Sequence, residues 1–319
     1  MKSILRKSLL SLCMAAVVGP ALAGYPERPI RLIVPFPAGG ASDTAARSLG
    51  QVMAKSIGQP VLIENRPGAG GSIAAQAVMN APADGYTLLW GTASMVAIPF
   101  IQRAAPFKSF GEFAPVSMVG RLTYCVFVSV GVPARSVAEL ISHVRANPGK
   151  ISYATGSLGE YMVTTQFMKA AGIDMTQVPY KGGAQAMPDL VAGRVQVNIG
   201  PFAGGYPLVR DGKLRILATL ANERSAAAPD VPTLAEAGLP GVSNATWQAV
   251  FAPQKTPKPV IERLSREVAA ALRDSGLRQQ FARQAVQPES STPAGLAATI
   301  LEDQEIWRRF VRENNIPQE

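Results

Sequence analysis

The sequence predicts an α/β protein with two domains joined by two crossover strands, and three observations support this prediction. Apolar runs typical of buried strands alternate with helical stretches along the 319 residues. The alternation falls into two sets, which meet near residue 122. The last third is helical and follows one further strand, which returns the chain to the first set. Two crossings of this kind build a hinge with a cleft between two lobes.

The elements are expected in the following order. Lobe 1 comprises residues 24–122 and 246–319, and lobe 2 comprises residues 123–245. Strands are predicted at Ile30–Val34, Val61–Glu64, Thr87–Trp90, Val116–Val119, Tyr124–Ser129, Ile151–Tyr153, Gln177–Pro179, Val195–Ile199, Arg215–Leu220 and Trp247–Ala252. Helices are predicted at Asp43–Ile57, Ser72–Asn80, Val137–Ala146, Tyr161–Ala171, Ala184–Ala192, Thr233–Ala237, Pro257–Asp274, Leu277–Arg283 and Pro293–Glu313. This alternation predicts open, mostly parallel sheets with helices on both faces.

Ligands of open α/β sheets bind beyond the C-terminal ends of the strands. The loops at these ends are Phe36–Ser42, Gly91–Met95, Ala154–Glu160 and Tyr180–Gly183. The sequence therefore places the candidate binding site on these four loops.

The most informative stretch follows the first predicted strand. Two prolines end the strand, and Gly39-Gly40 allow the backbone to turn sharply. Ser42 or Asp43 is expected to cap the helix that follows. Free backbone N–H groups and the positive end of the helix dipole then point the same way, as in an anion-binding site. An ordinary tight βα turn is the alternative, because the stretch is neither a P-loop nor a complete G-x-G-x-x-G motif.

The N-terminus has the pattern of a secretory signal peptide. Three basic residues precede an apolar run from Leu9 to Val18, and Ala21-Leu22-Ala23 follows. We therefore expect cleavage after Ala23 and an exported protein. A retained membrane anchor is the alternative, although the run is too short to span a bilayer. A lipoprotein is not expected, because Leu12 rather than a small residue precedes Cys13.

Composition narrows the function further. The formal charge of +9 includes the three positive charges of the predicted signal peptide. The remaining charges are scattered, so no nucleic-acid partner is expected, and an anionic small ligand is compatible with them. His143 is the only histidine, and Cys125, expected to be buried, is the only cysteine left after cleavage. These residues cannot build a His/Cys metal cluster or a disulfide, and no G-x-S-x-G motif accompanies His143. Binding is therefore favoured over catalysis, with no catalytic residue, cofactor or metal; a secreted α/β hydrolase or transferase is the rival.

Six segments, in order along the chain, carry a resemblance to a known family. They are Tyr25-Pro26-x-Arg28-Pro29-Ile30-x-Leu32-Ile33-Val34-Pro35-Phe36, Gly39-Gly40-x-x-Asp43, Glu64-Asn65-Arg66-Pro67-Gly68-Ala69-Gly70-Gly71, Ala83-Asp84-Gly85-Tyr86-Thr87-Leu88, Tyr180-Lys181-Gly182 with Asp189-Leu190-x-x-Gly193-Arg194-Val195, and Pro229-Asp230-Val231-Pro232-Thr233-x-x-Glu236-x-Gly238. Together they resemble the Bug-type receptors of tripartite tricarboxylate transporters, which are periplasmic solute-binding proteins.

The resemblance implies a two-lobed Venus-flytrap fold of the type II binding-protein kind. It also implies that a small carboxylate is captured between the lobes and delivered to the permease subunits of a membrane transporter. We expect a monomer. A receptor that presents its ligand-bound form to a membrane sensor kinase remains the alternative.

The resemblance further implies that loops of both lobes hold the carboxylate through backbone N–H groups, small hydroxyls and ordered water. Asp43 and Asp189 also suit local roles as helix caps or loop formers. The candidate ligand-binding residues are Phe36, Ala38, Gly39, Gly40, Ser42, Asp43, Thr92, Ser94, Thr155, Gly156, Ser157, Gly159, Glu160, Tyr161, Tyr180, Asp189 and Trp247. The Pro67–Gly71 run is expected to shape a loop near the cleft.

One departure from the family concerns residues 157–161. Relatives often carry a loop rich in serine and glycine followed by histidine, whereas Glu160 and Tyr161 stand here. Glu160 argues against a purely dianionic ligand such as citrate. Tyr161 and Trp247 could stack on a ring, which leaves room for an aromatic or amine-bearing carboxylate. Alternatively, Glu160 points outward as an acid in the first turn of its helix.

Overall fold

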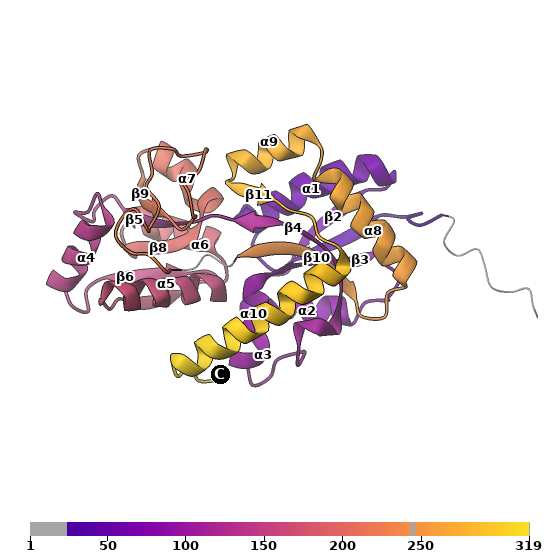
Figure 1. Cartoon of the computed structure of the whole chain (residues 1–319), viewed down its shortest axis with the longest axis horizontal. Coiled ribbons are helices and arrows are strands. Elements are labelled where there is room, and N and C mark those ends of the chain that lie inside the picture. Colours follow the sequence, from indigo (N-terminus) through magenta and orange to yellow (C-terminus); the bar gives the residue numbers. More distant parts are fainter. Residues whose placement is uncertain (1–23, 243–245, 319) are drawn as a thin grey trace, which may run out of the picture.

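The computed structural model describes residues 24–242 and 246–318, which form two lobes, each built on one β-sheet (Figure 1). The predicted signal peptide, residues 1–23, lies outside the described residues. The lobe 1 sheet has the strand order β11-β4-β10-β3-β1-β2, and the lobe 2 sheet has the order β7-β6-β8-β5-β9. The predicted two-lobed α/β architecture is confirmed.

The strands and helices alternate as expected. The strands are β1 Ile30–Val34, β2 Val61–Asn65, β3 Thr87–Thr92, β4 Phe113–Leu122, β5 Tyr124–Ser129, β6 Ser152–Thr155, β7 Thr176–Pro179, β8 Val197–Pro201, β9 Leu214–Thr219, β10 Trp247–Pro253 and β11 Val286–Pro288. The α-helices are α1 Ala41–Ile57, α2 Ser72–Met79, α3 Ile98–Ile101, α4 Val137–Ala146, α5 Leu158–Ala171, α6 Gly183–Val191, α7 Phe202–Arg210, α8 Lys258–Ala271, α9 Ser275–Arg283 and α10 Pro293–Glu313. Short 3₁₀ turns are η1 Ala69–Gly71, η2 Ala93–Ala97 and η3 Phe110–Glu112.

The lobe 1 sheet has a helical layer on each face. Leu32 and Leu88 belong to a core shared with α1 and α8, whereas Ile33 and Leu89 belong to a second core shared with α2 and α10. This division follows from the strand geometry, because successive side chains point to opposite faces. All residues of β3 are buried, so its Leu88-Leu89-Trp90 run does not alternate between apolar and polar residues.

The prediction of mostly parallel sheets is wrong. The pairs β1–β2, β1–β3, β6–β7 and β6–β8 are parallel. All pairs that involve β4, β5 or β10 are antiparallel. The reason lies in the crossings between the lobes: β4 leaves lobe 1 and β10 returns beside it in the opposite direction.

Several boundaries also differ from the sequence predictions. A helix was predicted at 233–237, but Thr233 forms an isolated bridge with Thr219 and residues 234–238 form turns. Elements α3, α7 and β11 were not predicted. Helix α1 begins at Ala41 with Gly40 as its N-cap, so neither Ser42 nor Asp43 occupies the cap position. Helix α5 begins at Leu158, three residues before the predicted start.

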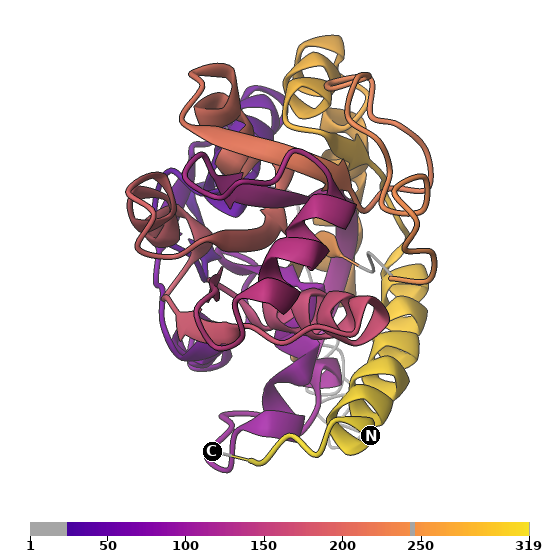
Figure 2. The ribbon, with the colours of Figure 1, turned by 90° about the vertical axis from the view of Figure 1, so that its left-hand side faces the viewer.

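The two lobes are linked where β4 passes into β5 and where the chain returns to β10. The amide of Leu122 donates to the carbonyl of Thr246 at 3.1 Å, so the two linking segments lie side by side. Helix α10 runs along one side of the molecule (Figure 2). It contacts lobe 2 as well, since the rings of Phe310 and Tyr161 lie 6.3 Å apart. The exact division into residues 24–122 plus 246–319 and 123–245 stays a prediction. Among the described helices, none has the length and apolar character of a membrane span.

Candidate functional site

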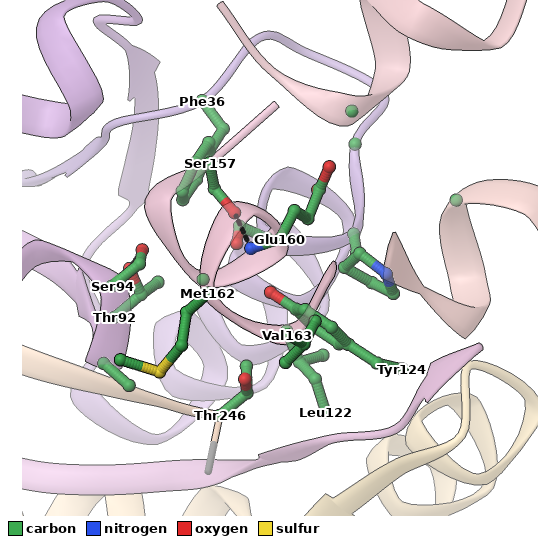
Figure 3. A pocket seen from close by; sticks show the side chains of 18 of the residues that line it. Phe36, Thr92, Ser94, Leu122, Tyr124, Ser157, Glu160, Met162, Val163 and Thr246 are labelled. Carbon is green, nitrogen blue, oxygen red and sulfur yellow. Dashed lines mark hydrogen bonds between the residues drawn. The ribbon is translucent and has the colours of Figure 1, made fainter. Parts of the chain in front are cut away.

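A cavity of about 90 Å³ lies between the lobes (Figure 3). Its lobe 1 wall comes from the starts of α1 and η2 and from α10, and its lobe 2 wall comes from α5 and α6. A single water needs about 10–15 Å³ of such space. The cavity therefore suits a molecule of several non-hydrogen atoms.

The start of α1 forms one end of the cavity. Gly39 has a φ of +80°, which favours glycine at the turn after β1. Ala41 and Ser42 line the cavity and belong to the first helical turn, whose N–H groups have no intrahelical acceptor. Two fixed backbone donors at the positive end of a 17-residue helix therefore border the cavity.

The backbone donors at this end are not the ones that the sequence suggested. The Gly39 amide donates to Oδ2 of Asp43 at 2.9 Å, and the Gly40 amide approaches the carbonyl of Pro37 at 3.4 Å. Both glycine amides therefore have acceptors within their own loop. The carboxylate of the chain itself occupies the position foreseen for a ligand carboxylate at Gly39.

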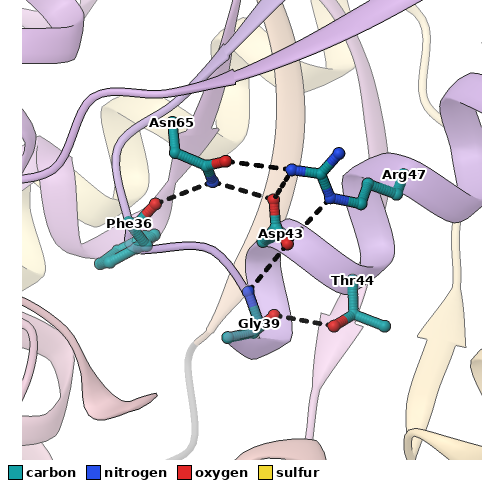
Figure 4. Close-up of polar contacts among 7 residues, drawn as sticks. Phe36, Gly39, Asp43, Thr44, Arg47 and Asn65 are labelled. Atoms are coloured by element: carbon teal, nitrogen blue, oxygen red, sulfur yellow. Dashed lines mark hydrogen bonds and ion pairs between the residues drawn. The ribbon is translucent and has the colours of Figure 1, made fainter. Parts of the chain in front are cut away.

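Asp43 is the centre of a network that fixes the 36–42 loop (Figure 4). Its carboxylate accepts hydrogen bonds from Arg47 Nε at 3.0 Å and from Asn65 Nδ2 at 2.9 Å. Asn65 Nδ2 also donates to the carbonyl of Phe36 at 3.0 Å. Burial alone would raise the pKa of Asp43, but the hydrogen bonds and charge of Arg47, Gly39 and Asn65 hold this pKa below its usual value. Asp43 therefore holds the 36–42 loop in place as an ionised carboxylate, and Arg47 balances its charge.

The lobe 2 end of the cavity is the N-terminus of α5. Ser157 is the N-cap, and its hydroxyl accepts a hydrogen bond from the Glu160 amide at 3.2 Å. Oε2 of Glu160 accepts from the Gly156 amide at 2.8 Å and from Asn198 Nδ2 at 3.2 Å. Glu160 lies in the first turn of α5 but is only 3% exposed. The alternative prediction, that its side chain points outward, is therefore wrong.

Burial is the main influence on Glu160. It raises the pKa of the carboxyl to about 7, although the bonds from Gly156 and Asn198 act in the opposite direction. Near neutral pH the cavity therefore contains a carboxyl group that is poised between its charged and neutral forms.

A second acid borders the same cavity. Asp303 of α10 is buried, and its Oδ2 accepts a hydrogen bond from Trp247 Nε1 at 2.5 Å. Burial raises the pKa of Asp303 to about 6, against the effect of this bond. Trp307, one turn further along α10, donates from Nε1 to the carbonyl of Ala93 at 3.1 Å and so ties α10 to η2.

The remaining lining residues supply hydroxyls and apolar surface. Thr92 Oγ1 and Ser94 Oγ lie 2.9 Å apart, and the phenol of Tyr124 is buried beside the start of α5. Burial, and then the charge of Glu160, raise the pKa of Tyr124 well above its usual value, so the phenol stays neutral. No lysine, arginine or histidine occurs among the described residues that line this cavity.

A second cavity of about 570 Å³ adjoins the first. Phe36, Ser157 and Trp307 line both cavities and so separate them. The turn η1 also lines the second cavity, as expected for the 67–71 glycine run near the cleft. Among residues 24–242 and 246–318, no cluster of side chains suits a metal ion.

The 17 predicted binding residues fall into three groups. Those that line the first cavity are Phe36, Gly40, Ser42, Thr92, Ser94, Ser157, Gly159 and Glu160. Those that line only the second cavity are Thr155, Gly156, Tyr161 and Tyr180. Those that line neither are Ala38, Gly39, Asp43, Asp189 and Trp247.

Local partners explain why members of the third group lie elsewhere. Asp43 accepts from Gly39, as described. Asp189 accepts from the hydroxyl of Tyr180 at 2.6 Å and pairs with Arg194, and so closes a surface turn. Trp247 is 1% exposed and is directed to Asp303.

Sequence reasoning missed several lining residues. Asp303, Ile306 and Trp307 share one face of α10 by their i, i+3, i+4 spacing, but only the folded chain shows that this face borders the cleft. Tyr124 and Thr246 lie directly after the two crossings, and that position was the available signal. Asn198 stands within an apolar run and was read as part of a strand.

Comparison with known proteins defines the family. The model of the tripartite tricarboxylate transporter family receptor matches residues 45–316. The chain belongs to this receptor family. BugT of Bordetella pertussis is 36% identical to this receptor over 304 residues, which cover 94% of this chain and 93% of BugT.

Solved structures agree with this assignment. The periplasmic binding protein BugD is 29% identical, with a TM-score of 0.88, and the match covers 92% of this receptor and all of BugD. Rpa4515 of R. palustris, solved with adipate, is 32% identical, with a TM-score of 0.89 and the same coverage. This receptor therefore has the two-lobed Venus-flytrap fold of type II periplasmic binding proteins, as the resemblance implied.

Proposed function

We propose that this receptor is a periplasmic solute-binding protein that captures a small organic carboxylate in the cavity between its lobes and delivers it to the membrane permease of a tripartite tricarboxylate transporter. The observation that carries the proposal is the cavity at the start of α1, whose described lining residues include no lysine, arginine or histidine. Backbone N–H groups and hydroxyls supply its donors, and these groups can hold a carboxylate without an arginine. The adipate-bound relative Rpa4515 supports the same class of ligand.

Export belongs to this proposal. The basic residues, the apolar run and Ala21-Leu22-Ala23 predict that the periplasmic protein begins at Gly24. Intact-mass measurement of the periplasmic fraction tests this point. A retained segment, or a lipid on Cys13, would contradict it.

Ligand capture is tested by a thermal-shift screen with adipate, malate, citrate, benzoate and aspartate. A ligand at 100 times its dissociation constant adds about 2.7 kcal/mol to the stability of the folded state. We expect at least one of these compounds to raise Tm, and the matching amide, such as adipamide for adipate, to have no effect. Equal shifts by acids and amides, or no shift by any acid, would reject carboxylate capture.

Delivery is tested by uptake of the radiolabelled compound that binds. Uptake into cells should require both this receptor and a permease of the tripartite tricarboxylate type. Uptake that persists without the receptor would contradict the transport role.

A further inference from the structure

The two ends of the cavity are built on the same pattern of hydrogen bonds. Asp43 and Glu160 are each the third residue of their helix, α1 and α5. Each accepts a bond from the amide four residues earlier, Gly39 at 2.9 Å and Gly156 at 2.8 Å. The repetition makes Glu160 the lobe 2 counterpart of Asp43.

The pattern extends to an asparagine on a neighbouring strand. Asn65 of β2 donates to Asp43 and to the carbonyl of Phe36. Asn198 of β8 donates to Glu160 and to the carbonyl of Ala154, at 3.2 and 3.1 Å. Asn65 therefore connects the Asp43 carboxylate to the backbone just after β1. Asn198 connects the Glu160 carboxylate to the backbone of β6 in the same way.

The two ends of the cavity differ in the residue four positions after the carboxylate, which is a cation only in lobe 1. Arg47, four residues after Asp43, pairs with it at 2.9 Å. The corresponding residue after Glu160 is Thr164, which is fully buried and whose hydroxyl donates to the Glu160 carbonyl at 2.7 Å. The hydrogen bonds that the described residues donate to the Glu160 carboxylate both end on Oε2. Of these two buried carboxylates, Asp43 thus has a cation as a partner, whereas Glu160 has the amides of Gly156 and Asn198.

The surroundings of Glu160 Oε1 determine which kind of group can bind beside this atom. A Cβ on Gly183, the first residue of α6, would lie 3.2 Å from Oε1, so this oxygen is at the positive end of α6 as well as of α5. The helix dipoles disfavour a cation there and favour an anion, so, like the bonds from Gly156 and Asn198, they act against the effect of burial on the Glu160 carboxyl.

Few charged or titratable groups face Glu160 from the elements packed against it. From β5 the group is the phenol of Tyr124, from β8 the amide of Asn198 beside Gly200, and from α6 only the glycine backbone. Asp303 of α10 lines the same cavity, and Lys181, which is exposed, lines the second cavity instead. None of these groups supplies a positive charge to Oε1.

We propose that Glu160 binds the ligand carboxylate as a neutral acid, so that capture of the ligand takes up one proton from solvent. The proposal rests on the proposed function. The proton goes to Oε1 of Glu160, and its O–H donates to the ionised ligand carboxylate, which the amides of Ala41 and Ser42 approach from lobe 1. A charged Glu160 would instead repel that carboxylate in a cavity without a cation.

The pKa of about 7 sets the expected size of the effect. Only the protonated fraction of the receptor is competent to bind, and the apparent dissociation constant rises as this fraction falls. Between pH 6 and pH 8 the affinity should fall about tenfold. An isolated carboxyl group, with a pKa of about 4, is ionised at both pH values.

The experiment is calorimetric titration of the wild type with whichever of adipate, malate, citrate, benzoate and aspartate gives the largest thermal shift. Titrations in two buffers of different ionisation enthalpy give the number of protons bound. We expect uptake of about 0.9 proton at pH 8 and about 0.1 at pH 6. This measurement does not depend on whether any variant folds.

The Glu160→Gln variant supplies the decisive comparison, because its amide donates like a neutral acid but cannot titrate. We expect its affinity to be independent of pH and within a few-fold of the wild type at pH 6. The matched variant Asp303→Asn, which removes the other acid of the cavity, should retain the proton uptake. Loss of uptake in Asp303→Asn but not in Glu160→Gln would show that Glu160 is the wrong acid.

Two further outcomes overturn the proposal. Equal affinity at both pH values, without proton uptake, would reject it while leaving carboxylate capture intact. Tighter binding at pH 8 than at pH 6, with loss of affinity in Glu160→Gln, would mean that an ionised Glu160 binds a ligand ammonium group. Absence of any thermal shift would instead reject the proposed function itself.

Discussion

Removing the titratable group at Glu160 should stabilise the protein at high pH. Glu160 is buried, and none of the described residues places a cation beside it, so ionising it in the folded state is unfavourable. The Glu160→Gln variant keeps an oxygen that can accept from Gly156 and Asn198 but carries no charge. We therefore expect the free energy of unfolding of the variant to exceed that of the wild type above pH 7.

The magnitude follows from the shift of the pKa, from 4.5 to about 7. At about 1.36 kcal/mol per pKa unit, this shift corresponds to about 3 kcal/mol. Between pH 4.5 and 7 the folded state binds more protons at this site than the unfolded state. The stability of the wild type is therefore fully present below pH 4.5, falls as pH rises to about 7, and stays lower above that value.

Urea denaturation of both proteins at a series of pH values measures the difference. The curves for wild type and variant should be similar near about pH 4 and separate by about 3 kcal/mol at pH 8. Asp43→Asn is the matched control with the opposite sign. The pKa of Asp43 is lowered, so its ionised form stabilises the fold, and the variant should be less stable than the wild type at neutral pH. A constant difference between Glu160→Gln and wild type at all pH values would refute the reasoning.

Three other predictions concern the same region. Gly156→Ala should lower the free energy of unfolding by about 1–3 kcal/mol or more, measured by urea denaturation, because the added Cβ would lie 2.0 Å from the Gly183 amide nitrogen. Ser157→Ala and Ser136→Ala each remove an N-cap, of α5 and α4, and each should cost about 1 kcal/mol; titration should show that only Ser157→Ala weakens ligand binding. Small-angle scattering should show a smaller radius of gyration with ligand if the lobes close on it, and an unchanged radius from an open state would contradict hinge closure.

The sequence was most informative where local signals agree with the fold. Strand β1 and helix α10 have the predicted bounds. The first does so because a run that is apolar except for Arg31 ends in prolines, the second because Thr292 caps a helix that begins with Pro293. Cys125 is fully buried, as expected for a small apolar side chain in β5.

Local signals misled where tertiary contacts decide. Thr233 and Glu236 exchange the reciprocal bonds of a capping box, which is typical of a helix start, but Gly238 with a φ of +90° ends the segment within one turn. Helix α7 was missed because its two glycines and its proline suggest a loop. Gly205 is required there, since a Cβ would lie 2.8 Å from the ring of Phe127.

The loops of the candidate site were predictable from the sequence, but the contribution of α10 was not. Loops at strand ends follow from the order of elements, and eight predicted residues line the first cavity. The orientation of Glu160 was not predictable. A side chain at the third position of a helix can point to solvent or accept a hydrogen bond from an amide that precedes the helix. Asn198, 38 residues away, helps to decide between the two, and a single sequence does not show that contact.

The contrast between Asp43 and Glu160 implies that lobe 1 and lobe 2 contribute differently to the pH dependence of ligand binding. Arg47 keeps Asp43 ionised, so the lobe 1 loop holds the same donors over the physiological pH range. The described residues of lobe 2 place no equivalent cation beside Glu160, so the contribution of this lobe to anion binding changes with the protonation of Glu160. If closure brings lobe 2 onto a ligand already held by α1, pH should act on the closed state more than on the first encounter. The rate of dissociation should then carry most of the pH dependence, and the rate of association little of it.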